Sequence, residues 1–268
     1  MPRWYPENAT TIVTGASSGI GMQIAKQLVA QGAVVIAVAR REERLQELVR
    51  SATISPSNTE RIIPVAGDIT DPGFRERIIA CAANVSDRLD LLVNNAGVGG
   101  IGPFREATPE RLRRIMEVNF FASVELTRLA LPMLRKGKSP VICNVSSVLG
   151  HFAVPDKSEY CASKFALHGW SDAMRAELAE EGIQVTLISP STTSSEFFDV
   201  AIETQASAVQ KRRQAMPPER VAALALRAIT RRRDEAILSA GGKFMVYADR
   251  LCPWLVNRLV RRHRSGRT

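Results

Sequence analysis

Residues 10–21 read TTIVTGASSGIG, and this stretch decides how the chain folds. An apolar run rich in β-branched residues leads into three glycines, and a helical pattern follows. The glycines allow a tight turn, close approach of the backbone to a bound group and close helix packing, while the helix N-terminus offers free N–H groups to an anion. We therefore expect a dinucleotide pyrophosphate here rather than a simple tight turn. The residues expected to hold it are Gly15, Ser17, Ser18, Gly19, Ile20 and Gly21.

Outward from this turn, apolar β-rich runs alternate with amphipathic helical patterns. The predicted strands are 10–14, 33–39, 61–65, 89–94, 140–146, 183–189 and 236–239. The predicted helices between them are 20–31, 42–51, 72–86, 109–135 and 158–181. Continuously apolar runs such as AVVIAVA suit a parallel sheet that helices cover on both faces. This predicts an α/β fold, a Rossmann-type doubly wound sheet of about seven strands, rather than a (β/α)₈ barrel with eight such units.

The chain of 268 residues has no linker that would divide it, so we expect one catalytic domain over 1–242. Within it, 190–218 shows weak periodicity and is predicted to be an excursion over the sheet edge that serves as a substrate lid. Residues 243–268 form a basic amphipathic C-terminal extension, divided by Pro253.

The formal charge of +9 is concentrated in that extension, which holds seven basic residues and one acidic residue. A near-neutral body with a basic tail, whose arginines over 258–267 have no aromatic residues interleaved, does not indicate a nucleic-acid binder. On a helix, Leu255, Val256, Leu259 and Val260 share one arc, and Arg258, Arg261 and Arg262 lie opposite. The pattern fits peripheral contact with an anionic membrane through 243–264, and equally a helix packed on its own domain or on a partner subunit.

The four cysteines are far apart and suggest neither a disulfide framework nor a zinc site, so we expect free thiols in a reducing compartment. No apolar stretch near the N-terminus resembles a signal peptide or a membrane anchor. These observations predict a cytoplasmic protein.

The second predicted strand ends in Val38-Ala39-Arg40-Arg41, without the carboxylate that binds the ribose 2′-hydroxyl in an NAD site. Two guanidinium groups suit a 2′-phosphate, which predicts NADP(H) as the cofactor. The alternative is that both arginines start a solvated helix, an interpretation that suits Arg41 better than Arg40.

Tyr160 and Lys164 are four residues apart in a predicted helix, which places the phenol and the ammonium on one face. We expect the cation to lower the pKa of the phenol and make Tyr160 a general acid/base.

Taken together, the motifs in 10–241 resemble those of the short-chain dehydrogenase/reductase family. The matching residues are TGASSGIG at 14–21, Asp68, Ile69, the run Asn94-Asn95-Ala96-Gly97, Asn119, Ser147, Tyr160 and Lys164. The resemblance implies that Ser147 binds the substrate oxygen, Tyr160 transfers its proton, and Lys164 binds the nicotinamide ribose. It implies a water-linked proton path at Asn119, through an irregularity in its helix.

The resemblance also implies that Asp68 and Ile69 hold the adenine, and that Asn95, Ala96 and Gly97 support the cofactor ribose. The spacing to Tyr160 selects Ser147 over Ser146. For Asn94, a role in the sheet competes with cofactor contact.

After the sixth strand the family has Pro-Gly and then a threonine, where this chain has Pro190-Ser191 and then Ser195. We expect Pro190 and Ser195 to contact the cofactor, with an altered loop geometry at Ser191.

The predicted substrate cleft is apolar, and its candidate lining residues are His151, Phe152, Val154, Phe197 and Phe198. A structural role for His151 is the competing interpretation. His151, His168 and His263 show no metal-ligand spacing with carboxylates, so no metal is expected.

The sequence therefore predicts an NADP(H)-dependent oxidoreductase that interconverts a carbonyl and an alcohol on an apolar small molecule. The family resemblance implies a homodimer or homotetramer. The alternative is a non-catalytic NADP-binding sensor or scaffold. Such a protein would be expected to have a damaged catalytic set, whereas this chain has the complete set of Asn119, Ser147, Tyr160 and Lys164.

Overall fold

The computed structural model describes residues 3–52, 61–194 and 215–265, and only the backbone over 261–265. Its seven strands form one parallel sheet in the order β3-β2-β1-β4-β5-β6-β7. They are β1 (Thr10–Thr14), β2 (Val34–Ala39), β3 (Ile62–Ala66), β4 (Leu91–Asn94), β5 (Val141–Val145), β6 (Gln184–Ser189) and β7 (Glu235–Ile237). The predicted doubly wound sheet is confirmed.

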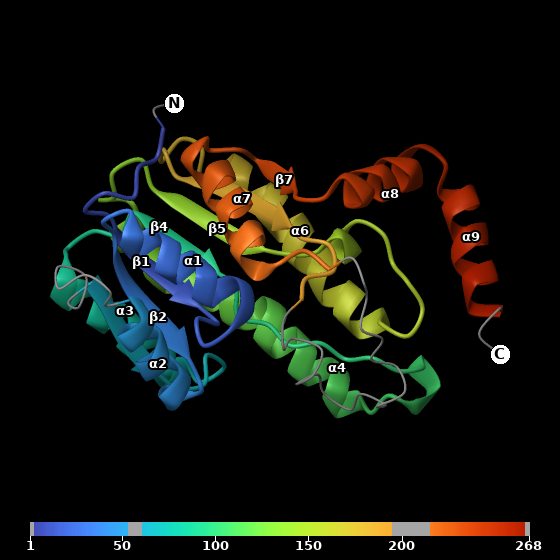
Figure 1. The fold of residues 1–268 in the computed structure, drawn as a ribbon, viewed down its shortest axis with the longest axis horizontal. Helices are drawn as coiled ribbons and strands as arrows, with labels where there is room; N and C mark the ends of the chain where they lie inside the picture. The colour runs from blue at the N-terminus through green and yellow to red at the C-terminus, as the bar shows by residue number, and fades with distance from the viewer. Residues whose placement is uncertain (1–2, 53–60, 195–214, 266–268) are drawn as a thin grey trace.

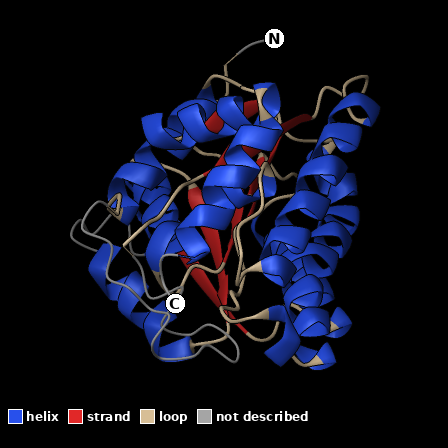
Figure 2. Cartoon of the chain, turned by 90° about the vertical axis from the view of Figure 1, so that its right-hand side faces the viewer, coloured by secondary structure: helices blue, strands red, loops and turns tan. Residues whose placement is uncertain are grey.

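The main helices are α1 (Gly19–Ala30), α2 (Glu42–Ala52), α3 (Pro72–Val85), α4 (Pro109–Met116), α5 (Ala122–Leu134), α6 (Ser158–Glu177), α7 (Pro218–Thr230), α8 (Ala240–Leu251) and α9 (Pro253–Ser265). Helices α1, α2 and α7 pack on one face of the sheet, and α3, α5 and α6 pack on the other (Figures 1 and 2). No helix of the described part of the chain is both long and apolar enough to cross a bilayer.

Alternate residues of each central strand enter opposite hydrophobic cores, as continuously apolar strands require. In β2, Val35 and Ala37 belong to the core under α1, α2 and α7, whereas Ile36 and Val38 belong to the core under α3, α5 and α6. Each fully buried Val or Ile contributes about 1.5–3 kcal/mol relative to an exposed one. Burial on both faces of the sheet is therefore what stabilises the three-layer fold.

The predicted helix over 109–135 differs from the structure, because a π-helical turn, Glu117–Phe121, separates α4 from α5. This is the irregularity that the family resemblance implied, and it contains the buried Asn119. The last predicted helix also ends earlier, at Glu177 instead of residue 181.

The predicted substrate loop over 190–218 is described only at its two ends. Thr193 pairs with Met216 in a parallel bridge, and Ser194 N donates to the Met216 carbonyl at 3.1 Å. The predicted lid itself lies outside the described residues.

The buried carboxylate of Asp90 ties together the N-terminal ends of three strands. Its Oδ2 accepts from Thr10 N at 2.9 Å, and its Oδ1 accepts from Lys138 N at 2.7 Å. Its carbonyl accepts from Trp4 Nε1 at 3.1 Å and from Val141 N at 3.0 Å. One residue beside β4 thus satisfies backbone groups at the start of β1 and in the approach to β5.

Replacing Asp90 by Ala leaves the buried N–H of Thr10 and the partly buried N–H of Lys138 without an acceptor, and unsatisfied buried groups cost about 1–3 kcal/mol each. We expect Asp90→Ala to lower the free energy of unfolding by about 3 kcal/mol, measured by urea denaturation. The exposed Asp87 provides the control, and Asp87→Ala is expected to stay within about 0.5 kcal/mol of the parent. Equal effects of the two substitutions would contradict this assignment.

Candidate active site

A cavity of about 840 Å³ lies at the carboxyl ends of the strands. Its walls come from the loops after β1, β2, β3, β4, β5 and β6 and from the start of α8. The sheet changes direction of winding between β1 and β4, where the crevice of a doubly wound sheet binds ligands. The cavity is therefore where this fold is expected to bind a ligand.

Thr14 and Asn95 clasp the ends of β1 and β4 together at this point. The Thr14 hydroxyl accepts from the backbone N of Asn95 and of Ala96, each at 2.9 Å, and donates to the Val93 carbonyl at 3.2 Å. The Asn95 amide donates to the carbonyls of Thr14 at 2.9 Å and Gly15 at 3.3 Å. These bonds fix the glycine-rich turn against the loop after β4.

The glycine-rich turn needs its glycines for two separate reasons. Gly15 has a φ of +67°, which side chains rarely tolerate. A Cβ on Gly21 would lie 2.4 Å from the Gly15 carbonyl oxygen, so Gly21 serves helix packing and does not line the cavity. Helix α1 begins at Gly19 with no acidic residue in its first turn and no side-chain cap from Ser18. Its N–H groups are thus left for an anionic ligand.

Arg40 and Arg41, predicted to bind the cofactor, follow β2 and line the cavity. The Arg41 guanidinium donates to Ser17 Oγ at 3.2 Å, which joins it to the glycine-rich turn. Arg41 therefore does more than begin a solvated helix, the alternative that suited it better than Arg40. Arg40 is exposed on the cavity wall.

Asp68 and Ile69 line the same end of the cavity, and Arg114 from α4 joins them. Arg114 donates to the Asp68 carboxylate at 2.7 Å. Burial alone would raise the pKa of Asp68, but hydrogen bonds from Thr70 and Arg114 outweigh it and lower the pKa to about 2. The predicted motifs did not include Arg114, because its partner lies in another loop, far away in the sequence.

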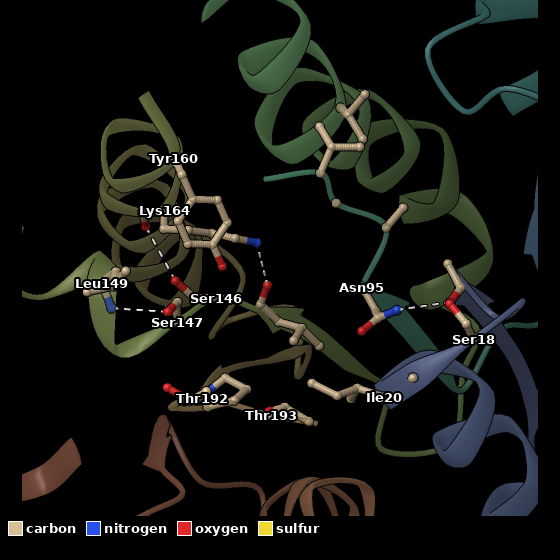
Figure 3. A pocket seen from close by; sticks show the side chains of 18 of the residues that line it. Ser18, Ile20, Asn95, Ser146, Ser147, Leu149, Tyr160, Lys164, Thr192 and Thr193 are labelled. Carbon is tan, nitrogen blue, oxygen red and sulfur yellow. Dashed lines mark hydrogen bonds between the residues drawn. The ribbon is translucent and has the colours of Figure 1, made fainter. Parts of the chain in front are cut away.

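Tyr160, Lys164 and Ser147 lie together on one side of the cavity, facing Asn95 and Ser18 on the other (Figure 3). Ser147 hydrogen-bonds the Tyr160 phenol, and its Oγ accepts from Leu149 N at 3.1 Å. Ser146 points elsewhere and donates to the Lys164 carbonyl at 3.4 Å. This geometry agrees with the choice of Ser147 by spacing.

The expected lowering of the Tyr160 pKa by Lys164 is not what the structure gives. Burial raises the pKa of Tyr160 well above its ordinary value, and the hydrogen bond with Ser147 only partly opposes this effect. Lys164 Nζ donates to the Val145 carbonyl at 2.9 Å and lies 5.8 Å from the centre of the phenol ring. Burial lowers the pKa of Lys164 to about 8. Desolvation of both groups therefore outweighs their mutual attraction.

Asn119 lies behind the cavity wall and does not line it. Its Oδ1 accepts from Val98 N at 2.8 Å, and its Nδ2 donates to the Val98 carbonyl at 3.0 Å and to Ser163 Oγ at 2.9 Å. A Cβ on Gly97 would lie 3.2 Å from Asn119 Oδ1 and 3.8 Å from Lys164 Nζ. The side chain thus holds the π-helical turn and α6 around the Lys164 ammonium.

A buried ion pair beside the site was missed by the sequence analysis. Arg111 on α4 donates to the Glu159 carboxylate at 2.7 and 3.2 Å, and both side chains are almost fully buried. Glu159 immediately precedes Tyr160, so the pair anchors the first turn of α6. No local pattern predicts a contact between residues so far apart in sequence.

The end of the cavity beyond Tyr160 is apolar. Phe152 and Val154, two of the candidate substrate contacts, line it together with Val148, Leu149 and Met245. Pro190 also lines the cavity, next to Thr192 and Thr193. The predicted residues Ser195, Phe197 and Phe198 lie outside the described residues.

His151 lies off the cavity wall and is not retained as a substrate contact. Its Nε2 is 2.9 Å from Ser189 Oγ and 3.0 Å from Glu235 Oε1, and Arg250 approaches its Nδ1 at 3.3 Å. His168 and Glu235 do form a group with His151 at ligand distance, contrary to expectation, because β6–β7 pairing brings Glu235 beside it. Because the Arg250 guanidinium also contacts His151 and Glu235, we interpret these residues as an ion-pair network and not as a metal site.

The model of the family described as short chain dehydrogenase matches residues 9–206. The chain is 31% identical over 277 residues to the bovine (Bos taurus) Dehydrogenase/reductase SDR family member 7B, covering 96% of this chain and 82% of that protein. It is 38% identical over 190 residues to the mouse (Mus musculus) protein of that name, covering 69% of this chain but only 58% of the mouse protein.

Two solved structures have the same fold. A short chain dehydrogenase from Burkholderia cenocepacia, in complex with NADP, has a TM-score of 0.80 at 27% identity, with 96% of this chain and 99% of that chain covered. A Burkholderia phymatum protein in complex with NAD has a TM-score of 0.83 at 20% identity, with 94% and 96% covered. With the family model matching well over half of its length, this chain belongs to the short-chain dehydrogenase family of oxidoreductases.

Proposed function

We propose that this protein is an NADP(H)-dependent oxidoreductase that interconverts a carbonyl and an alcohol on an apolar small molecule. The observation that carries the proposal is one continuous cavity. It joins an anion-binding turn and two arginines to a buried Tyr-Ser-Lys group and then to an apolar end. A dinucleotide fits such a space lengthwise, with its reactive end beside Tyr160.

The residues present fit a nicotinamide dinucleotide. The open first turn of α1 and the positive φ of Gly15 suit a pyrophosphate, and Asp68 and Ile69 border the adenosine end. Asn95, Ala96 and Gly97 line the middle of the cavity, and Lys164 and Pro190 the far end. When bound, the cofactor supplies or accepts a hydride at its nicotinamide ring.

The choice of NADP over NAD depends on Arg40 and Arg41. Both line the cavity where β2 ends, and the position that holds an acidic residue in NAD sites holds none here. A related structure at 27% identity is in complex with NADP. Two guanidinium groups attract a 2′-phosphate and leave a 2′-hydroxyl without an acceptor.

The proton chemistry follows from burial. A Tyr160 phenol with a raised pKa stays protonated at neutral pH, so it can donate its proton to the oxygen of a carbonyl undergoing reduction. Ser147, hydrogen-bonded to the phenol, holds the same oxygen in line. The buried Lys164 ammonium stabilises the negative charge that the phenol oxygen gains, and Asn119 keeps α6 in place behind it.

We further propose that copies of this chain associate through α5 and α6. Phe121, Leu129 and Phe165 are exposed on the surface formed by these helices and the adjoining π-helical turn, where apolar side chains favour a partner subunit. A homodimer or homotetramer would cover them.

The cofactor choice is tested by titrating NADPH and NADH in parallel. We expect Arg40→Ala to raise the Kd for NADPH about tenfold or more, with the Kd for NADH unchanged. Arg44→Ala on the adjoining helix is the control for loss of a surface charge. Tighter binding of NADH by the parent protein would contradict the assignment.

Removing the phenol hydroxyl tests the proton donor. We expect Tyr160→Phe to lower kcat by about 10²–10⁴-fold while NADPH binding is retained, measured as NADPH oxidation with apolar ketones and aldehydes. Tyr5→Phe, at an exposed site, is expected to leave kcat unchanged. Full turnover by Tyr160→Phe would contradict the role of Tyr160 as proton donor. If the parent bound NADPH but turned over no substrate, the alternative of a non-catalytic NADP-binding sensor or scaffold would be favoured.

The pH profile tests Lys164. Its ammonium is present below a pKa of about 8 and is lost above it, so kcat/KM for NADPH-dependent reduction is expected to fall as the pH rises through this value. Lys164→Arg, which stays charged, should abolish that fall in whatever activity it retains. A parent profile that stays flat well above pH 8 would contradict the prediction.

A further inference from the structure

The outer side of α8 and α9 forms a surface that does not line the cavity. Figure 1 shows them extending beyond the end of the sheet, and α9 packs on α8. The inner side of α8 is fixed, because Val246 packs with Val148, Phe152 and Ile237. No described residue covers the opposite side of α8, where Phe244, Tyr247 and Leu251 are exposed.

Large apolar side chains gather on this uncovered side. Phe244, Tyr247 and Leu251 recur at helical spacing along α8 and are 71%, 54% and 81% exposed, and Trp254 at the start of α9 is 67% exposed. Leu255 and Leu259, one turn apart on α9, are exposed as well. We call these six residues the α8–α9 stripe. Single exposed apolar residues are ordinary, but six of them on two adjoining helices indicate an interaction surface.

The charge on the same helices indicates the kind of partner. Lys243 and Arg258 are exposed, and Arg250 is half-exposed beside Glu235. Asp249 is the one acidic residue of the sequence over 243–268, against seven basic residues. Helices that expose Trp, Tyr, Phe and Leu and also carry an excess of basic residues complement an anionic bilayer, where apolar groups enter the interface and cations meet lipid headgroups.

A second copy of the chain fits this face less well. A two-fold interface brings the same basic patch of both subunits together, so the net positive charge of one copy would repel that of the other. An anionic lipid surface neutralises this charge instead.

We propose that the α8–α9 stripe is a docking surface for an anionic membrane, on which the protein lies without spanning the bilayer. Gly241, Gly242 and Met245 of α8 also line the apolar end of the cavity. Docking would therefore bring that end close to the lipid, a consequence that rests on the proposed function and suits a substrate taken up from the bilayer.

The test is flotation of the full chain with vesicles of phosphatidylcholine and phosphatidylserine, and with vesicles of phosphatidylcholine alone. We expect binding to the anionic vesicles that weakens as salt is raised. The triple variant Tyr247→Ser/Leu251→Ser/Trp254→Ser should bind at least about tenfold more weakly. The matched control is Tyr5→Ser/Phe104→Ser/Leu112→Ser, which removes three exposed apolar side chains elsewhere and should bind like the parent.

A second measurement needs no folded triple variant. On addition of anionic vesicles, the tryptophan emission of the parent should shift to shorter wavelength, and Trp254→Phe should abolish the shift. No flotation of the parent, or equal flotation of both triple variants, would overturn the proposal. The proposal would also be overturned if the parent did not bind vesicles and the triple variant converted a dimeric parent into a monomer. NADPH titration without vesicles reports on the cofactor site separately, so failure of one proposal is distinguishable from failure of the other.

Discussion

Thr14 at the end of β1 and Asn95 just after β4 are joined by hydrogen bonds at 2.9 Å, and the candidate site depends on this clasp. The sheet winds away from these two strands in opposite directions, so loops at their ends would otherwise diverge. The clasp holds the glycine-rich turn against the loop that carries Gly97. Gly21 then packs α1 onto Gly15 so closely that no side chain fits between them.

The catalytic end is organised around burial. Tyr160 and Lys164 are both nearly inaccessible, and desolvation moves the pKa of the phenol up and that of the ammonium down. A protonated phenol beside an apolar cavity is what the proposed reduction of a carbonyl requires of its proton donor. The surrounding hydrogen bonds of Asn119 and the buried Arg111–Glu159 pair keep α6, and hence Tyr160, in register.

The sequence predicted the parts of the molecule that follow from local pattern. The structure contains the seven predicted strands, the glycine-rich turn and the helix with Tyr160 and Lys164. These could be predicted because hydrophobic periodicity, glycine positions and the spacing of two residues are local signals. Arg114 and the Arg111–Glu159 pair were missed, since each depends on a contact across the fold. The predicted lowering of the pKa of Tyr160 was wrong. The spacing in the sequence shows that a cation is near the phenol, but it does not show that the folded protein removes the phenol from water.

The prediction for His151 also failed because it depended on a contact between residues far apart in the sequence. Its distance from Ser147 in the chain suggested the cleft, but the pairing of β7 with β6 places Glu235 next to the imidazole. The ring turns to that carboxylate and to Ser189, away from the cavity. The neighbouring Phe152, one residue later, lines the cavity instead.

The central claim is that one cavity holds the whole cofactor with its reactive end at Tyr160. A crystal structure of the protein with NADP⁺ tests this most directly. We expect the 2′-phosphate within hydrogen-bond distance of Arg40 or Arg41, the pyrophosphate at the first turn of α1, and the nicotinamide ring beside Tyr160 and Lys164. A cofactor bound in the reverse direction, or bound outside this cavity, would show that the proposed site is wrong.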